Sequence, residues 1–122
     1  MNHPVVHIEL SAKDHSEAAE WYKKIFGWEI RHIPEMNYST ADPGTGENFG
    51  MGFNPISDES PAGTVVFYIH TDDVAASVKQ VKDAGGEVLV EDFDIPTVGT
   101  MATFKDPSGN VVSILQPVPE SA

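Results

Sequence analysis

The chain has 122 residues, no cysteine, and 19 acidic against 7 basic side chains, which gives a formal net charge of −12. A domain of this length can bury a core without disulfides, and the lack of thiols excludes thiolate nucleophiles and cysteine-ligated metals, so we expect a cytoplasmic protein. The negative charge repels phosphate backbones and no apolar run reaches membrane-spanning length, so neither nucleic acid nor a membrane is an expected partner.

The first half of the chain has the pattern of a strand, a helix and three further strands. In the first strand, apolar residues alternate with His7 and Glu9, so one face is predicted to be core and the other polar. Apolar residues then recur every three or four positions over residues 16–26, which predicts a helix that ends at Gly27. The three further strands are expected at residues 28–33, 38–41 and 48–54.

The last of these strands alternates glycines with large apolar residues. Gly50 and Gly52 fall on one face, where another element can come close. Phe49, Met51 and Phe53 fall on the other face, which we expect to line a ligand-binding cup together with the polar face of the first strand.

The second half repeats this order after a polar, proline-bearing linker at residues 56–62. An offset of 59 residues superimposes the first strands, the helix caps and the glycines that end the helices, and an offset of 62 superimposes the last strands. We therefore predict one domain, residues 1–122, made of two βαβββ modules at residues 3–55 and 63–117. The fold class is α+β, with eight mixed strands in a cupped sheet and two main helices outside it.

Four segments resemble the vicinal oxygen chelate superfamily, which includes glyoxalase I, methylmalonyl-CoA epimerase, extradiol dioxygenases and bleomycin-resistance proteins: VVHIEL, EAAEWYKKIFGW, FYIHTDDVAASV and DPSGNVVSILQP. The resemblance covers nearly the whole chain and implies the fold rather than a reaction. Metal-dependent members place ligands in the first and last strands of each module, which the resemblance carries onto His7, Met51, Val66 and Ser113. Only His7 is a good ligand for a divalent ion, so we expect no metal cofactor.

Two functions remain open. The favoured one is metal-free binding of a small molecule in the cup, similar in mode to bleomycin-resistance proteins, with the acidic charge suiting a cationic, partly aromatic ligand. The alternative is a glyoxalase-like lyase or isomerase in which Glu9 acts with His7 or His70 as acid and base. The expected ligand-binding residues are Phe49, Met51, Phe53, Tyr68, Ser113 and Trp28.

Three further hypotheses concern a non-catalytic role for His7 and Glu9, a rival metal site and the oligomeric state. His7 and Glu9 could form a hydrogen-bonded pair with no catalytic role. A rival metal site made of His7, Glu9 and His70 is conceivable, because nitrogen and oxygen donors on neighbouring strands can form a facial triad. A homodimer is expected, because a single module leaves one sheet face uncovered and the resemblance implies pairing.

Overall fold

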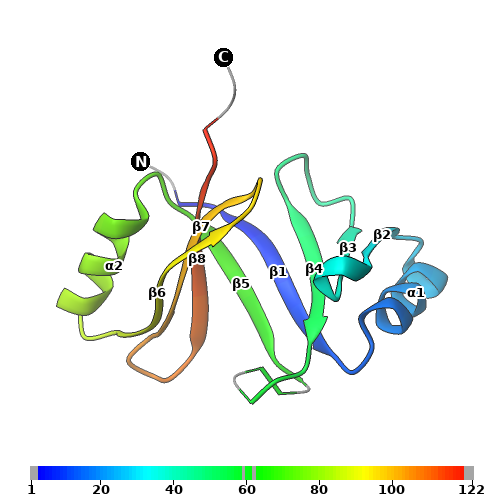
Figure 1. Ribbon diagram of the computed structural model, residues 1–122, viewed down its shortest axis with the longest axis horizontal. Helices are drawn as coiled ribbons and strands as arrows, with labels where there is room; N and C mark the ends of the chain where they lie inside the picture. Colours follow the sequence, from blue (N-terminus) through cyan, green and yellow to red (C-terminus); the bar gives the residue numbers. More distant parts are fainter. Residues whose placement is uncertain (1–2, 59, 62, 120–122) are drawn as a thin grey trace. The chain divides into compact units, whose positions relative to one another are not determined.

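The computed structural model describes residues 3–58, 60–61 and 63–119, and these form eight strands, two α-helices and one 3-10 helix (Figure 1). The chain divides into a first unit, Val6–Val66, and a second unit that contains residues 3–5 and 67–119 of the described chain. The elements are β1 Val5–Ala12, α1 His15–Phe26, β2 Glu29–Ile33, η1 Pro34–Met36, β3 Tyr38–Asp42, β4 Gly50–Pro55, β5 Val65–His70, α2 Val74–Asp83, β6 Glu87–Ile95, β7 Gly99–Lys105 and β8 Val111–Pro117. The α+β class and the two βαβββ series are confirmed.

In the first unit the strands follow the order β2-β3-β4-β1. Strand β1 runs parallel to β4, with His7 opposite Gly50 and Glu9 opposite Gly52, while β2, β3 and β4 pair antiparallel. Helix α1 packs on one face of this sheet (Figure 1). The buried core between helix and sheet consists of Ala12, Ala19, Ala41 and Phe53.

Helix α1 begins and ends as its sequence predicts. The carboxylate of Asp14 accepts hydrogen bonds from the backbone N–H groups of Ser16 and Glu17, and Gly27 ends the helix in the left-handed conformation with φ of 72°. The bond from the Glu17 backbone and that from the Ser16 side chain hold the pKa of Asp14 below its usual value. These local interactions explain why the helix could be read from the sequence.

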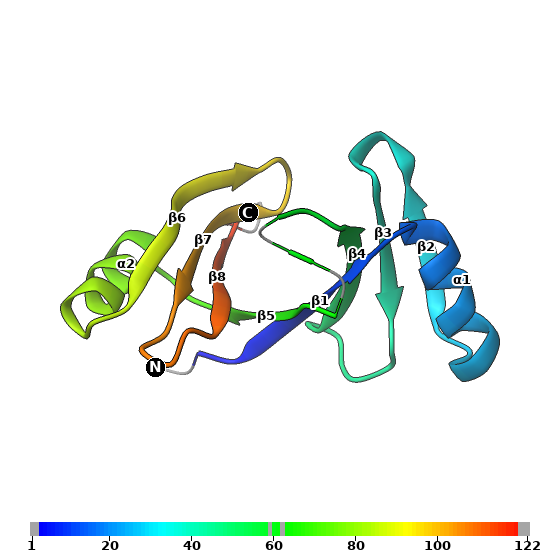
Figure 2. The same cartoon turned by 90° about the horizontal axis from the view of Figure 1, so that it is seen from below.

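In the second unit the order is β5-β8-β7-β6, with β5 parallel to β8 and the remaining pairs antiparallel. Helix α2 lies against β6, β7 and β8 (Figure 2), over a core that contains Val78, Ala102 and Ile114. The turn before β8 is closed by Asp106, whose carboxylate accepts bonds from the side chain and backbone of Asn110. These bonds, the side-chain one first, lower the pKa of Asp106.

The prediction that Met51 and Phe53 lie on the same face of the sheet as His7 and Glu9 is wrong. Met51 and Phe53 point to the side covered by α1, where Phe53 is 1% exposed and Met51 packs against the same core. Phe49 precedes β4 rather than lying in it. The reason is hydrophobic: a sheet covered by a helix on one face turns its large apolar side chains to that helix, which leaves the glycines on the face of His7 and Glu9.

Among the described residues, no helix has both the length and the apolar character that crossing a bilayer requires.

Candidate functional site

A phenol lies between an imidazole and a carboxylate on the face of the first unit that points away from α1. Tyr38, the first residue of β3, donates a hydrogen bond of 2.7 Å from its hydroxyl to Glu9 Oε2. The same hydroxyl oxygen lies 2.9 Å from His7 Nε2, and His7 Nε2 lies 3.5 Å from Glu9 Oε2. The His7 and Glu9 side chains are 23% and 18% exposed, so this group, which we call the Tyr38 triad, is sheltered yet reachable from solvent.

The proton positions in the Tyr38 triad follow from its hydrogen bonds. An ionised carboxylate only accepts hydrogen bonds, so the proton of the Tyr38 hydroxyl points to Glu9. The phenol oxygen then accepts from His7, which places the proton of a neutral His7 on Nε2. The phenol therefore orients both the carboxylate and the imidazole.

Gly52 makes the Tyr38 triad possible. A Cβ atom at position 52 would overlap the hydroxyl oxygen and the attached ring carbon of Tyr38. At Gly50, in contrast, the nearest atom to a Cβ would be His7 Nδ1 at 3.6 Å, an ordinary contact. The sequence indicated that the glycine face of β4 admits another element, and in the structure that element is the ring of Tyr38.

The candidate residues of β5 and β8 belong to the second unit. Tyr68 lies opposite Ser113 in the parallel pair, and both are buried. The Ser113 hydroxyl is 2.8 Å from the Thr103 hydroxyl on β7. His70, at the end of β5, places Nε2 3.0 Å from Asp72 Oδ1. The predicted acid–base residues His7 and Glu9 are thus brought together in one unit, while His70 is paired with Asp72 in the other.

The strand registers correct one of the positions carried over from metal-dependent relatives. Glu9 lies opposite Gly52, and Tyr68, its counterpart at the offset of 59 residues, lies opposite Ser113. Gly52, rather than Met51, is therefore the counterpart of Ser113.

The carried-over positions supply few donor atoms for a metal ion. Gly52 has no side chain, Val66 is apolar, and the Ser113 hydroxyl is engaged with Thr103, so His7 is the one good ligand among them. Within each unit, the described residues contain no group of three or more histidine, aspartate or glutamate side chains that could hold an ion. This donor set does not fit a divalent metal.

The remaining predicted ligand-binding residue, Trp28, packs in an aromatic stack beside α1. Its ring lies 5.1 Å from that of Tyr22 at an interplanar angle of 9°, and 5.8 Å from that of Phe26. The Tyr22 ring also meets Phe53 at 5.5 Å. Trp28 therefore fixes the orientation of Tyr22.

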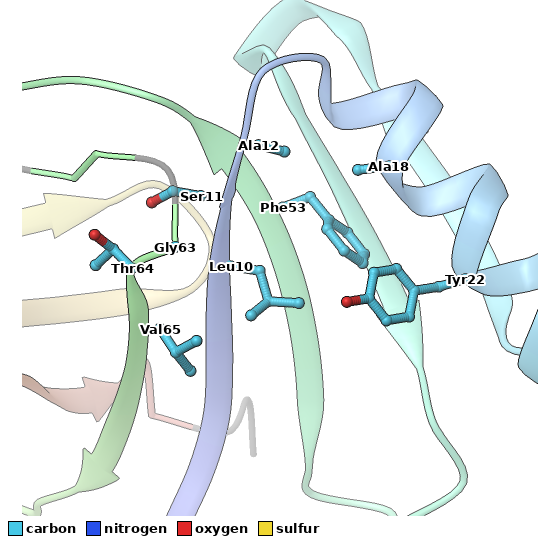
Figure 3. A pocket seen from close by; sticks show the side chains of 9 residues that line it. All are labelled: Leu10, Ser11, Ala12, Ala18, Tyr22, Phe53, Gly63, Thr64 and Val65. Carbon is cyan, nitrogen blue, oxygen red and sulfur yellow. The ribbon is translucent and has the colours of Figure 1, made fainter.

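A pocket lies between β1 and α1, with residues of β4 and residues 63–65 completing a lining that contains no member of the Tyr38 triad (Figure 3). Its volume is about 200 Å³. Three of its lining residues, Ala12, Ala18 and Gly63, are small, and this leaves space where larger side chains would fill the core. The full lining consists of Leu10, Ser11, Ala12, Ala18, Tyr22, Phe53, Gly63, Thr64 and Val65.

A second polar network ties α1 to β2 and β3. The buried Ser39 hydroxyl lies 2.6 Å from His15 Nδ1 and 2.7 Å from His32 Nδ1, and His32 Nε2 lies 2.8 Å from Glu20 Oε2. Sequence spacing alone does not connect the two imidazoles, because their shared partner Ser39 is contributed by another strand. The network satisfies a buried hydroxyl and anchors the start of α1.

Comparison with known proteins identifies the family. Residues 5–114 match the model of the Glyoxalase/Bleomycin resistance protein/Dioxygenase superfamily. The chain is 31% identical over 121 residues to a protein of Mycobacterium tuberculosis named as a glyoxylase, CFP32, covering 89% of this chain and 44% of that protein. It is 31% identical over 132 residues to the lactoylglutathione lyase GLX1 of Arabidopsis thaliana, covering 98% of this chain and 47% of that enzyme. The chain thus spans less than half the length of these relatives.

Among solved structures, a Streptomyces coelicolor methylmalonyl-CoA epimerase variant in complex with 2-nitronate-propionyl-CoA shares the fold, with a TM-score of 0.71 and 20% identity, covering 100% of this chain and 99% of that one. The match over residues 5–114 and the shared fold agree with the resemblance read from the strand, helix and turn segments. This chain belongs to the glyoxalase/bleomycin resistance protein/dioxygenase superfamily.

Proposed function

We propose that this chain binds a small cationic molecule without a metal ion, and that Glu9 is the anchor. The observation that carries the proposal is the 2.7 Å hydrogen bond by which Tyr38 orients the sheltered Glu9 carboxylate. Hydrogen bonds between a carboxylate and a cationic donor are charge-assisted and stronger than bonds between neutral groups, so an ammonium or amidinium group of a ligand suits this acceptor. The net charge of −12 raises the local concentration of such a cation.

Benzamidine and benzamide test this proposal as a matched pair, since they have nearly the same shape and differ in charge. We expect benzamidine to raise the melting temperature and to bind measurably by calorimetry, and benzamide to do neither. Glu9→Gln should abolish the benzamidine response, because it keeps the size of the side chain and removes the charge. Equal binding of the two compounds, or benzamidine binding that survives in Glu9→Gln, would refute the proposal.

The Tyr38 triad also supports a second candidate, an isomerase that moves a proton between two carbon atoms. Glu9 would remove the proton from a hydroxyl-bearing carbon next to a carbonyl, and Tyr38, released from the protonated Glu9, would donate a hydrogen bond to the carbonyl oxygen that gains charge. Glu9 would return the proton to the former carbonyl carbon, and the proton of the substrate hydroxyl would move to the oxygen on that carbon. The hydroxyl and the carbonyl thus exchange places, and no co-reactant is needed. The 2.7 Å contact places a donor beside the base, and a relative named as a lactoylglutathione lyase is in keeping with a 2-oxoaldehyde–thiol adduct as substrate.

The adduct of methylglyoxal with glutathione tests this second candidate. Thioester formation followed by absorbance should fall by about 10²–10⁴-fold in Glu9→Gln. Tyr38→Phe should lower kcat more than it raises KM, since its hydrogen bond is needed where charge develops. No turnover by the native chain, combined with tight benzamidine binding, would reject the enzyme and retain the binding protein.

A homodimer remains a proposal. It is supported by the large apolar side chains that α1 exposes, with Trp21 at 54%, Ile25 at 51% and Phe26 at 60%. Light scattering during size-exclusion chromatography should give twice the chain mass of 13.2 kDa. A strict monomer at micromolar concentration would exclude the dimer. The cytoplasmic location also remains a prediction from the missing cysteines.

A further inference from the structure

We infer that the pocket beside α1 is a second binding site, distinct from the Tyr38 triad, for a small uncharged aromatic molecule that carries one hydrogen-bonding group. The lining of this pocket has no charged residue. An ion would lose its hydration there without a compensating charge, so the pocket selects against the cations that Glu9 favours. The pocket therefore favours uncharged ligands, whereas the proposed site at Glu9 favours cations.

The volume of the pocket sets the size of the ligand. An apolar cavity of about 150 Å³ holds benzene. The pocket measures about 200 Å³, which leaves room for one ring and a substituent of about two further heavy atoms. The space is maintained by Ala12 and Ala18 on facing elements and by Gly63, whose φ of 90° disfavours any residue with a side chain.

The walls of the pocket are held in place before a ligand arrives. Phe53 is 1% exposed and forms part of the core, and Tyr22 is fixed against it by the stack on Trp28. Leu10 completes an apolar wall on β1 (Figure 3). A preformed apolar wall favours binding because little side-chain freedom is lost when the ligand enters.

One polar group is directed into this apolar space. The hydroxyl of Tyr22 points toward Leu10 across the pocket (Figure 3). Ser11 and Thr64 border the same space, and their backbones are joined by a 3.2 Å hydrogen bond from the Ser11 N–H to the Thr64 carbonyl. A phenol hydroxyl can donate to or accept from a ligand hydroxyl or carbonyl, which gives a single-ring alcohol, phenol or ketone an advantage over a plain hydrocarbon.

Benzyl alcohol and ethylbenzene are the probes, since they have the same number of heavy atoms and differ in one hydroxyl group. In methyl-resolved NMR titrations of the intact chain, both should shift the methyl signals of Leu10, Ala12 and Ala18. Benzyl alcohol should bind about 2- to 10-fold more tightly once its own hydration is accounted for, and Tyr22→Phe should remove that advantage while leaving ethylbenzene unchanged. Shifts confined to other methyl groups, or an advantage that survives in Tyr22→Phe, would overturn the inference.

The second test of the pocket fills it with a larger side chain. Ala18→Leu adds three carbon atoms where the ring would lie, so binding of both probes should weaken by about tenfold or more. Ala75→Leu is the matched control, because Ala75 is an exposed helical alanine of α2 in the second unit. Circular dichroism establishes that both variants are folded. Unchanged binding in a folded Ala18→Leu variant would show that the probes bind elsewhere.

Discussion

The Tyr38 triad makes a sharp prediction about Gly52. Adding a Cβ atom at this position overlaps the end of the Tyr38 side chain, and the ring has to swing away from Glu9 and His7. Gly52→Ala should therefore destabilise the first unit even though alanine is better tolerated than glycine inside a strand. The same substitution should become favourable once the Tyr38 ring has been removed.

The magnitude follows from the bonds that are lost. The bond from Tyr38 to the ionised Glu9 is worth about 1.5–3 kcal/mol and the bond with His7 about 0.5–1.5 kcal/mol. Within a strand, alanine is more stabilising than glycine by about 0.5–1 kcal/mol, and this gain offsets part of the loss. Gly52→Ala should therefore lower the free energy of unfolding by about 1–3 kcal/mol at this partly exposed site. In a Tyr38→Ala background, Gly52→Ala should instead stabilise the protein by about 0.5–1 kcal/mol, which is a reversal of sign.

Urea denaturation followed by tryptophan fluorescence measures the free energy of unfolding of the native chain, of each single variant and of the double variant. Tryptophan fluorescence reports on the first unit, because both tryptophans, Trp21 and Trp28, lie in it. Gly50→Ala is the matched control on the same strand and face. A Cβ at position 50 meets only an ordinary contact with His7, so this variant should be neutral or slightly stabilising. If Gly52→Ala costs as much without the Tyr38 ring as with it, the phenol does not account for glycine at position 52.

Three further predictions concern metal, the last strand and acid. Elemental analysis should find no stoichiometric Ni, Zn, Fe or Mn; one tightly held ion that is lost in His7→Ala would contradict the metal-free proposal. Ser113→Glu should lower the melting temperature, because a carboxylate would replace a hydroxyl that is 1% exposed and bonded to Thr103, and calorimetry should still detect no zinc binding. Micromolar zinc affinity in that variant would mean that other ligands already converge on this strand. Because Asn110 lowers the pKa of Asp106, the stability from its ionised form is complete above the ordinary value of 3.8 and is lost as pH falls through the lower folded-state pKa. The urea midpoint should thus fall more steeply in that acid window for the native chain than for Asp106→Asn, and parallel profiles would refute this.

The fold was predictable because its signals are local. Asp14 caps α1 through residues two and three positions away, and Gly27 ends the helix in the conformation that glycine favours. Alternation along β1 likewise separated His7 and Glu9 from the core face. Each of these features depends on a few neighbouring residues, and the sequence displays them directly.

The site was predicted less well because its contacts are long-range. Alternation in β4 separates Met51 and Phe53 from the glycines, but it does not say which face meets the helix. Tyr38 was read only as part of a strand, since its partners Glu9 and His7 lie 29 and 31 positions away. One signal was available: two glycines on one face of a strand next to a tyrosine-bearing strand predict a ring lying over them.

In both units a side-chain hydroxyl group lies at the equivalent position of the last strand. In the second unit, Ser113 of β8 bonds its hydroxyl to Thr103 of the neighbouring strand β7. In the first unit, Gly52 of β4 carries no side chain, and the hydroxyl over it comes from Tyr38 of the neighbouring strand β3. Neutral hydroxyl groups therefore stand at both positions, and each is held by a cross-strand contact. Under the proposed function, Glu9 on β1 is the carboxylate of the Tyr38 triad that would attract a cation or accept a proton, so we expect substitutions at Glu9 to affect function more than substitutions at Ser113.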